Sequence, residues 1–265
     1  MISTRIASLA AACVIGGAST VASAALQPYT FTIIGGSSLA VGGQFGGANP
    51  TNAQPGTTFN TNYTGTIAVE IDHAANLIYF PGASQLNAGN QPVNVQPFTD
   101  STPGSAPGNY GREGNVQLSP LPPIFGVEAL RNLRLDVETA AIGTPTSYNP
   151  TTGQFASSAL GMTIDQGNSD FLFGSIFGET DLASSAFSLN QAVPASTLTS
   201  NGTTETLTLR LQSGLFPYTI VNTNDSSVSF GGTIVATRTI VPEPASLAVL
   251  GLGGLSLLAR RRRRA

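Results

Sequence analysis

The chain of 265 residues contains no lysine and no tryptophan, and it has one histidine and one cysteine. Charged residues make up 9% of it, against about a quarter of an average soluble domain. The cysteine, Cys13, lies in an N-terminal segment that we expect to be removed. The mature chain then has no disulfide, no cysteine nucleophile and no cysteine-bound zinc. We also expect a protein that needs no cofactor and is not an enzyme, since the other candidates for chemistry are few.

The first 24 residues have the pattern of a secretory signal peptide. Arg5 supplies a positive start, Ile6–Ile15 is an apolar run, and Ala22-Ser23-Ala24 is an A-x-A cleavage site. We expect a signal helix over residues 1–24 that is cut off between Ala24 and Ala25 during export.

The C-terminus combines three features in a fixed order. Val241-Pro242-Glu243-Pro244 precedes the apolar run Leu247–Ala259, and the tail ends in five arginines: Arg260, Arg261, Arg262, Arg263 and Arg264. A helix over the apolar run would span about 20 Å of a hydrocarbon core of roughly 30 Å. Arginine side chains can reach the headgroups and remain on the cytoplasmic side. We expect a short membrane helix with the arginines as its stop.

This tail resembles the PEP-CTERM sorting signal of Gram-negative bacteria, in which a Pro-Glu-Pro motif, a short apolar helix and an arginine cluster follow one another. The resemblance implies transient anchoring in the inner membrane and processing by an exosortase, a membrane-embedded cysteine peptidase. Delivery to the cell surface or to an extracellular polysaccharide matrix would follow. The same tail is also labelled an ice-binding protein C-terminal domain, a label that describes the tail and does not show ice binding. The resemblance is confined to residues 241–265.

The body between the two ends, residues 25–240, is acidic. It contains five arginines and 13 acidic residues, a net charge of −8 with His73 neutral. Nucleic acids and anionic membrane surfaces both attract basic proteins, so neither is an expected partner of this body.

Apolar residues in the body recur with a period of two, which is typical of strands. The alternation predicts strands over residues 27–34, 65–72, 77–80, 133–138, 206–211, 228–230 and 233–240. Residues 73–76 make a hairpin turn between the second and third of these. The one helical candidate, residues 127–133, is better explained as a strand. The last two strands are either a pair or one strand interrupted by a bulge at Gly231-Gly232.

Many short strands with glycine and proline between them predict an all-β fold, an antiparallel β-sandwich of jelly-roll type with long loops. An up-and-down barrel and a β-helix are the second and third choices. The long loops are residues 35–64 and 81–123. Loops of this length are uncommon in compact domains, so they could contain further strands such as 91–98 or 115–118.

Few residues are candidates for chemistry. His73 lies in the predicted turn beside Asp72, but neighbouring strand residues point to opposite faces, so Asp72 is poorly placed to orient it. His73 is therefore expected to be a solvated turn residue. The segment Asp165-Gln166-Gly167-Asn168-Ser169-Asp170 places oxygen ligands in a glycine-containing turn, which makes Asp165 and Asp170 weak calcium candidates. The simpler interpretation is a turn rich in Asp and Asn between strands.

Two functions of different classes remain. The first is a non-catalytic cell-surface or extracellular-matrix protein, which the polar, weakly charged composition favours. The second is a carbohydrate-binding or carbohydrate-active domain that works on exported exopolysaccharide. The second needs a cleft with converging carboxylates and tyrosines, because the chain lacks the tryptophan that sugar sites favour.

Overall fold

The computed structural model describes residues 25–45, 49–53, 60–89, 110–120, 123–173, 176–183, 187–192, 194–220 and 223–241. Within these ranges all regular structure is β, apart from one short 3-10 helix, η1 (Ser157–Ala159). The predicted all-β class is thus confirmed. No helix within the described ranges is long and apolar enough to cross a membrane. The expected signal helix and C-terminal membrane helix fall outside these ranges.

The strands follow one another along the chain as β1 (Gln27–Ile33), β2 (Ser38–Phe45), β3 (Asn49–Ala53), β4 (Asn60–Asp72), β5 (Leu77–Tyr79), β6 (Gln85–Ala88), β7 (Tyr110–Pro120), β8 (Pro123–Thr139), β9 (Thr146–Ser147), β10 (Gln154–Phe155), β11 (Leu160–Phe173), β12 (Ile176–Asp181), β13 (Ser188–Leu189), β14 (Ser196–Ser200), β15 (Thr204–Gln212), β16 (Phe216–Ile220) and β17 (Thr223–Thr239).

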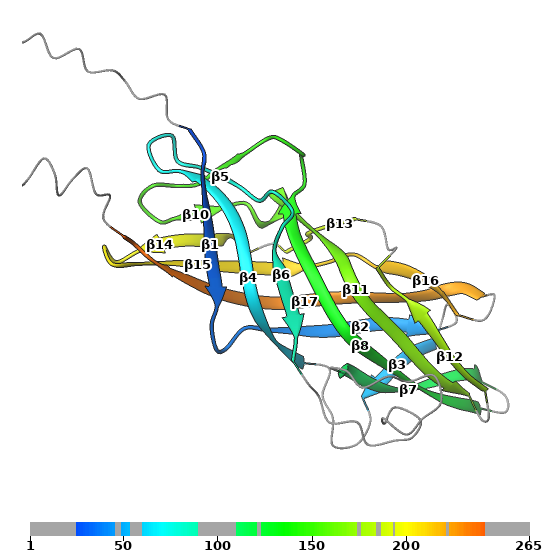
Figure 1. The fold of residues 1–265 in the computed structure, drawn as a ribbon. Helices are drawn as coiled ribbons and strands as arrows, with labels where there is room; N and C mark the ends of the chain where they lie inside the picture. Colours follow the sequence, from blue (N-terminus) through cyan, green and yellow to red (C-terminus); the bar gives the residue numbers. More distant parts are fainter. Residues whose placement is uncertain are drawn as a thin grey trace, which may run out of the picture.

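Four of these strands close into a small barrel. β1 pairs with β4 and with β17, and β2 pairs with the same two strands, so the hydrogen-bonded ladders form a ring. The other strands flank this ring, and all ladders are antiparallel parts of one continuous sheet (Figure 1). The ring is a feature that the jelly-roll prediction did not contain. It joins β1 and β17, the first and last strands of the body.

The core lies on the inner face of the ring, because every second residue of each strand points inward. Most inward residues of the four ring strands are apolar and almost completely buried: Phe31, Ile33, Leu39, Val41, Ile67, Val69, Ile71, Ile234 and Ala236. Full burial of each valine, leucine, isoleucine or phenylalanine among them stabilises the fold by about 1.5–3 kcal/mol. The alternation that predicted strands therefore also selects the core.

Most of the predicted strands are confirmed. Residues 27–34 correspond to β1, and residues 65–72 and 77–80 form the predicted hairpin, with Asp72 opposite Leu77 at its turn. Residues 133–138 and 206–211 lie in β8 and β15. The helical candidate over residues 127–133 is part of β8, so the preference for a strand is confirmed.

The two predicted long loops contain strands that the sequence pattern did not reveal. Residues 35–64 include β2, β3 and the start of β4, and residues 81–123 include β6 and β7. The suspected strand over residues 115–118 is part of β7, whereas residues 91–98 lie outside the described ranges. Glycine and asparagine interrupt the apolar alternation of β2 and β7, which hid them from a pattern based on hydrophobicity.

The last strand, β17, runs through Gly231-Gly232 without the predicted interruption. Its ladder with β2 continues across these residues, and its ladder with β15 includes both of them, without a shift in register. A Cβ atom at Gly232 would overlap the carbonyl oxygen of Ser38 in β2, and one at Gly231 would meet the side chain of Gln212. Gly232 therefore permits the close approach of the β2 and β17 backbones that closes the ring, and Gly231 leaves room for the side chain of Gln212, without a bulge.

We expect Gly232→Ala to lower the free energy of unfolding by about 2–3 kcal/mol, because the added methyl group must push β2 away from β17. Urea denaturation of the purified protein measures this change. Gly35→Ala is the control, since a Cβ atom there meets nothing within 4 Å. Equal effects of the two substitutions would contradict the close-approach explanation.

Candidate functional site

Polar and charged residues replace the apolar core at one end of the barrel. Each of the strands β1, β15 and β17 has such a residue two positions from a buried apolar one, on the same inward face. The pairs are Tyr29 with Phe31, Glu205 with Leu207, and Arg238 with Ala236. The start of β1 and the end of β17 lie at this end of the molecule, together with β5, β10 and β14 (Figure 1). The candidate site is built from these inward positions.

Glu205 and Arg238 form a buried ion pair. They lie directly opposite each other in the ladder between β15 and β17. Nε and Nη2 of Arg238 both lie 2.6 Å from Oε2 of Glu205, whose residue is only 4% exposed. The guanidinium carbon lies 3.6 Å from the ring centroid of Tyr29, a cation–π contact. The two charges compensate each other, which is the condition for keeping both away from water.

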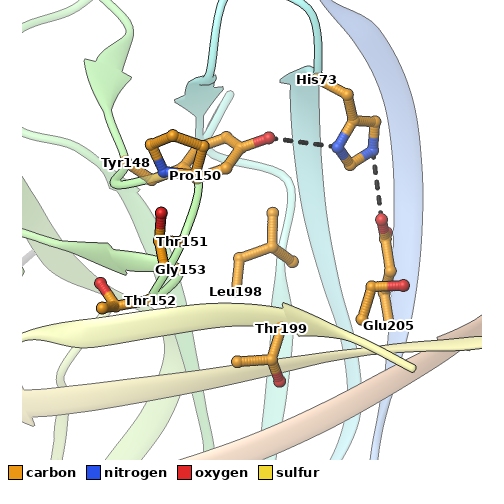
Figure 2. Close-up of a pocket in the computed structure, with 10 residues that line it drawn as sticks. His73, Tyr148, Pro150, Thr151, Thr152, Gly153, Leu198, Thr199 and Glu205 are labelled. Atoms are coloured by element: carbon orange, nitrogen blue, oxygen red, sulfur yellow. Dashed lines mark hydrogen bonds and ion pairs between the residues drawn. The ribbon is translucent and has the colours of Figure 1, made fainter. Parts of the chain in front are cut away.

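His73 joins this pair from the turn between β4 and β5. Asp72 holds the turn, since its Oδ1 accepts hydrogen bonds from the backbone N–H groups of Ala74 and Ala75 at 2.9 and 2.8 Å. Nε2 of His73 lies 3.2 Å from Oε1 of Glu205, and Nδ1 lies 3.1 Å from the hydroxyl oxygen of Tyr148 (Figure 2). The predicted turn position is confirmed. The side chain is 45% exposed, yet both ring nitrogens have partners, which the sequence did not indicate.

The order hydroxyl, imidazole, carboxylate is the order found in hydrolase triads, but the electrostatics differ. Burial raises the pKa of the Tyr148 phenol, and the charges of Glu205 and Asp72 raise that pKa further. Arg238 neutralises the carboxylate that would stabilise an imidazolium. When His73 is neutral, its Nε2–H donates to Glu205 and its Nδ1 accepts from the hydroxyl of Tyr148. In this arrangement both ring nitrogens of His73 are held by neighbouring side chains.

A cleft of about 360 Å³ opens beside His73 and Tyr148. Its walls are the segment from Pro150 to Gly153, the end of β14 and Glu205, as Figure 2 shows. Hydroxyl groups dominate the lining, from Thr151, Thr152, Thr199 and Ser200. Glu205 is the one carboxylate among the lining residues, and both of its oxygens are already engaged. The cleft suits a neutral, hydrogen-bonding molecule better than an acid–base pair.

The segment with the calcium candidates is a strand and not the turn that the sequence predicted. Asp165 and Asp170 both lie in β11, whose register against β8 shifts on either side of Gln166. Oδ2 of Asp165 lies 3.3 Å from Nε of Arg134, so this carboxylate is paired with a cation. Within the part of the chain that the structure describes, no three His, Cys, Asp or Glu side chains are grouped to hold a metal.

A second buried carboxylate, Asp136, lies beside Asp165. Its Oδ1 accepts hydrogen bonds from the backbone N–H groups of Ser84 and Val137, both at 2.7 Å. Burial raises the pKa of Asp136 to about 6, with Asp165 and Glu138 adding to the rise and the two N–H groups opposing it. This carboxyl is the strongest candidate for titration in the mildly acidic range.

Sequence reasoning missed Glu205 and Arg238, and it missed the contacts that Tyr29 and Tyr148 make with them and with His73. A signal was present, because Glu205 and Arg238 occupy inward positions of strands whose other inward residues are apolar. Two opposite charges at such positions indicate a buried pair. Which strands would bring them together could not be read from the pattern, since the two residues are 33 positions apart.

Of the predicted processing sites, the structure describes only the residues that border the body. Ala25 is exposed, and Val241, 77% exposed, follows directly on the last backbone hydrogen bond, from Ile240 N–H to the Thr203 carbonyl. Ala22, Ala24, Pro242, Glu243, Pro244 and Arg260–Arg264 lie outside the described ranges. The body therefore ends where the tail motif begins, with no intervening segment.

Comparison with known proteins identifies the tail alone. Residues 241–264 match the PEP-CTERM protein-sorting motif. No curated protein and no solved structure matches the chain. The motif implies an exported protein that an exosortase processes.

We expect Arg238→Ala to lower the free energy of unfolding by about 3–5 kcal/mol, because it leaves the carboxylate of Glu205 buried without its main partner. The double variant Glu205→Gln with Arg238→Met should recover much of this loss. Arg210, an exposed arginine of β15, supplies the control, and Arg210→Ala should change the stability by less than about 0.5 kcal/mol. Urea denaturation at pH 7 compares the variants, and similar losses for Arg238→Ala and Arg210→Ala would contradict a buried pair.

We expect the stability to rise as the pH falls from about 6 to about 4. The pKa of Asp136 is about 6 in the folded state and 3.8 ordinarily, so the folded protein binds this proton more tightly than the unfolded chain. Asp136→Asn, whose amide oxygen can accept the same two N–H groups, should remove this dependence and be at least as stable at pH 7.5. The pKa difference limits the change to about 3 kcal/mol.

Denaturation midpoints at several pH values between 4 and 7.5 test this prediction. Asp181→Asn, which alters an exposed carboxylate of β12, is the control and should keep the wild-type pH dependence. If the stability of Asp136→Asn still rises as the pH falls, another group is responsible for the pH dependence.

Proposed function

We propose that this chain, with its PEP-CTERM protein-sorting motif, is a non-catalytic protein of the cell surface or extracellular matrix. Export and exosortase processing follow from the motif itself. The destination and the absence of catalysis are the proposal. The observation that carries it is the direct junction between a folded β body and the motif, with Ile240 still hydrogen-bonded and Val241 exposed.

The proposed route has three steps. The secretion machinery removes residues 1–24, and residues 25–240 fold outside the inner membrane. The C-terminal helix and Arg260–Arg264 hold the chain in that membrane for a time, and the exosortase then recognises Pro242-Glu243-Pro244. Because β1 and β17 pair at Thr32 and Thr237, both ends of the body lie together, which leaves the opposite end of the barrel pointing away from the membrane.

A non-catalytic role is supported by the state of the polar side chains at the barrel end. Glu205, Arg238, His73 and Tyr148 form one chain of contacts, and none of them is left to act as an acid, base or nucleophile toward a substrate. Such a chain stabilises the end of a barrel. It supports a structural role for these residues.

A second candidate function is the binding of exported polysaccharide. The observation that favours it is the hydroxyl-rich lining of the cleft, together with the threonine side chains on the outer face of β1, β15 and β17. Hydrolysis receives less support than binding, because glycosidases use two carboxylates and the cleft lining includes one.

Two tail variants test the sorting route. Replacing Arg260–Arg264 with serine should let the tail pass through the membrane, because the apolar run alone is too short to span the hydrocarbon core. This variant should appear uncleaved in the soluble exported fraction. Replacing Pro242-Glu243-Pro244 with alanine should leave the chain in the membrane and unprocessed, because the anchor remains and the recognition motif is lost.

Cell fractionation followed by mass spectrometry of both termini distinguishes these outcomes. The wild-type protein is the control and should begin at Ala25, lack the arginine cluster and be found at the cell surface or in the matrix. Identical behaviour of the two variants would refute the separation of anchoring from recognition. A wild-type protein that keeps Met1 would refute export.

A further inference from the structure

Threonines face one another across five neighbouring strands. The ladders pair Thr66 with Thr32, Thr32 with Thr237, Thr237 with Thr206 and Thr206 with Thr199. The row therefore crosses β4, β1, β17, β15 and β14 at the strand spacing of about 4.8 Å. A second pair, Thr204 and Thr239, lies two residues further along β15 and β17.

These threonines point away from the core. Their neighbours in the strands, Phe31, Ile67, Ala236, Leu207 and Leu198, are buried on the inner face. Alternation along a strand then places the threonine hydroxyl and methyl groups on the outer face. This outer row carries no charge, although the body as a whole is acidic.

A groove begins beside this row, where β1 and β17 separate. The two strands share ladder partners only at Thr32 with Thr237 and at Ile33 with Ala236, whereas β1 stays paired with β4 back to Gln27 and β17 stays paired with β15 up to Thr239. The gap is a groove of about 580 Å³. Its threonines are Thr30, Thr32, Thr204, Thr237 and Thr239.

The chemistry of the groove is neutral. Arg238 is its one charged lining residue, and the guanidinium is paired with Glu205 and stacked on the ring of Tyr29. Within the described part of the chain, no hydrogen bond engages the hydroxyl groups of the five threonines. Each hydroxyl can donate one hydrogen bond and accept two, and each methyl group offers an apolar contact beside it.

We propose that this groove binds a neutral polysaccharide chain. A sugar ring presents hydroxyl groups at its edge and C–H groups on its face, which matches the paired hydroxyl and methyl groups of the threonines. An anionic polysaccharide would gain no electrostatic attraction here, because Glu205 neutralises the charge of Arg238 and the surrounding body is acidic. The inference rests on the proposed location of the protein, where exported polysaccharide is present.

The test uses the exported protein purified from its natural fraction and native gels that contain a soluble polysaccharide. Dextran, a galactomannan and a mixed-linkage β-glucan are the neutral probes, and alginate is the anionic probe. At least one neutral probe should retard the protein, whereas alginate should not. Replacing Thr32 and Thr237 with valine should weaken that binding about tenfold, because valine keeps the shape and loses the hydroxyl.

Thr208→Val is the matched control, because Thr208 lies on the outer face of β15 and outside the groove. It should bind within twofold of the wild type, and both valine variants should melt near the wild-type temperature. The groove assignment is overturned if no neutral probe retards the protein, if alginate binds more tightly, or if Thr208→Val loses as much binding as the groove variant. A groove variant that changes only the self-association of the protein also overturns it.

Measurements of location and of binding on the same protein distinguish a failure of this inference from a failure of the proposed function. Retardation by a neutral probe in a protein that never reaches the surface or matrix would refute the proposed location alone. A protein that reaches the surface and ignores all neutral probes would refute the groove alone.

Discussion

A ring of four strands encloses very little space, and this constraint shapes most of what surrounds it. A barrel of eight strands is just wide enough for side chains to fill its interior, so four strands must bend sharply around a few residues. β17 carries the closure, because it pairs with β1, β2, β15 and β16 at different points along its length. At Gly232 the backbone of β2 comes too close to β17 for any side chain.

The small ring also explains why charges lie at its end. An apolar core must stop where the strands reach water, and here the inward positions change from Ala236 and Leu207 to Arg238 and Glu205 within a single step of the alternation. Because Arg238 and Glu205 are paired and hydrogen-bonded to each other, neither charge is left without a partner where the core ends. The outward side chains that alternate with these residues are threonines. The strands β15 and β17 therefore carry an ion pair on the inner face and a neutral surface on the outer face.

Hydrophobic alternation predicted the class, the core strands and the β4–β5 hairpin, because burial on one face of a strand imposes a period of two. It could not predict β2 or β7, in which glycine and asparagine replace the expected apolar residues. It also placed Asp165 in a turn, since Gly167 and Asn168 are turn residues by composition. In the structure Gln166 and Asn168 pair with β8, and Asn168 also pairs with β12, so the segment is part of a strand. The contact of His73 with Glu205 depends on residues 132 positions apart in the chain, which no local pattern records.

The direct junction between β17 and the tail gives the molecule a mechanical property. A pull on Val241 acts along the axis of β17, and the interstrand hydrogen bonds run perpendicular to that axis. The nine residues of β15 and the ladder with β2 therefore bear the load together in shear instead of opening one bond at a time. Tension applied through Val241 therefore reaches a strand whose ladders with β15 and β2 resist it in shear.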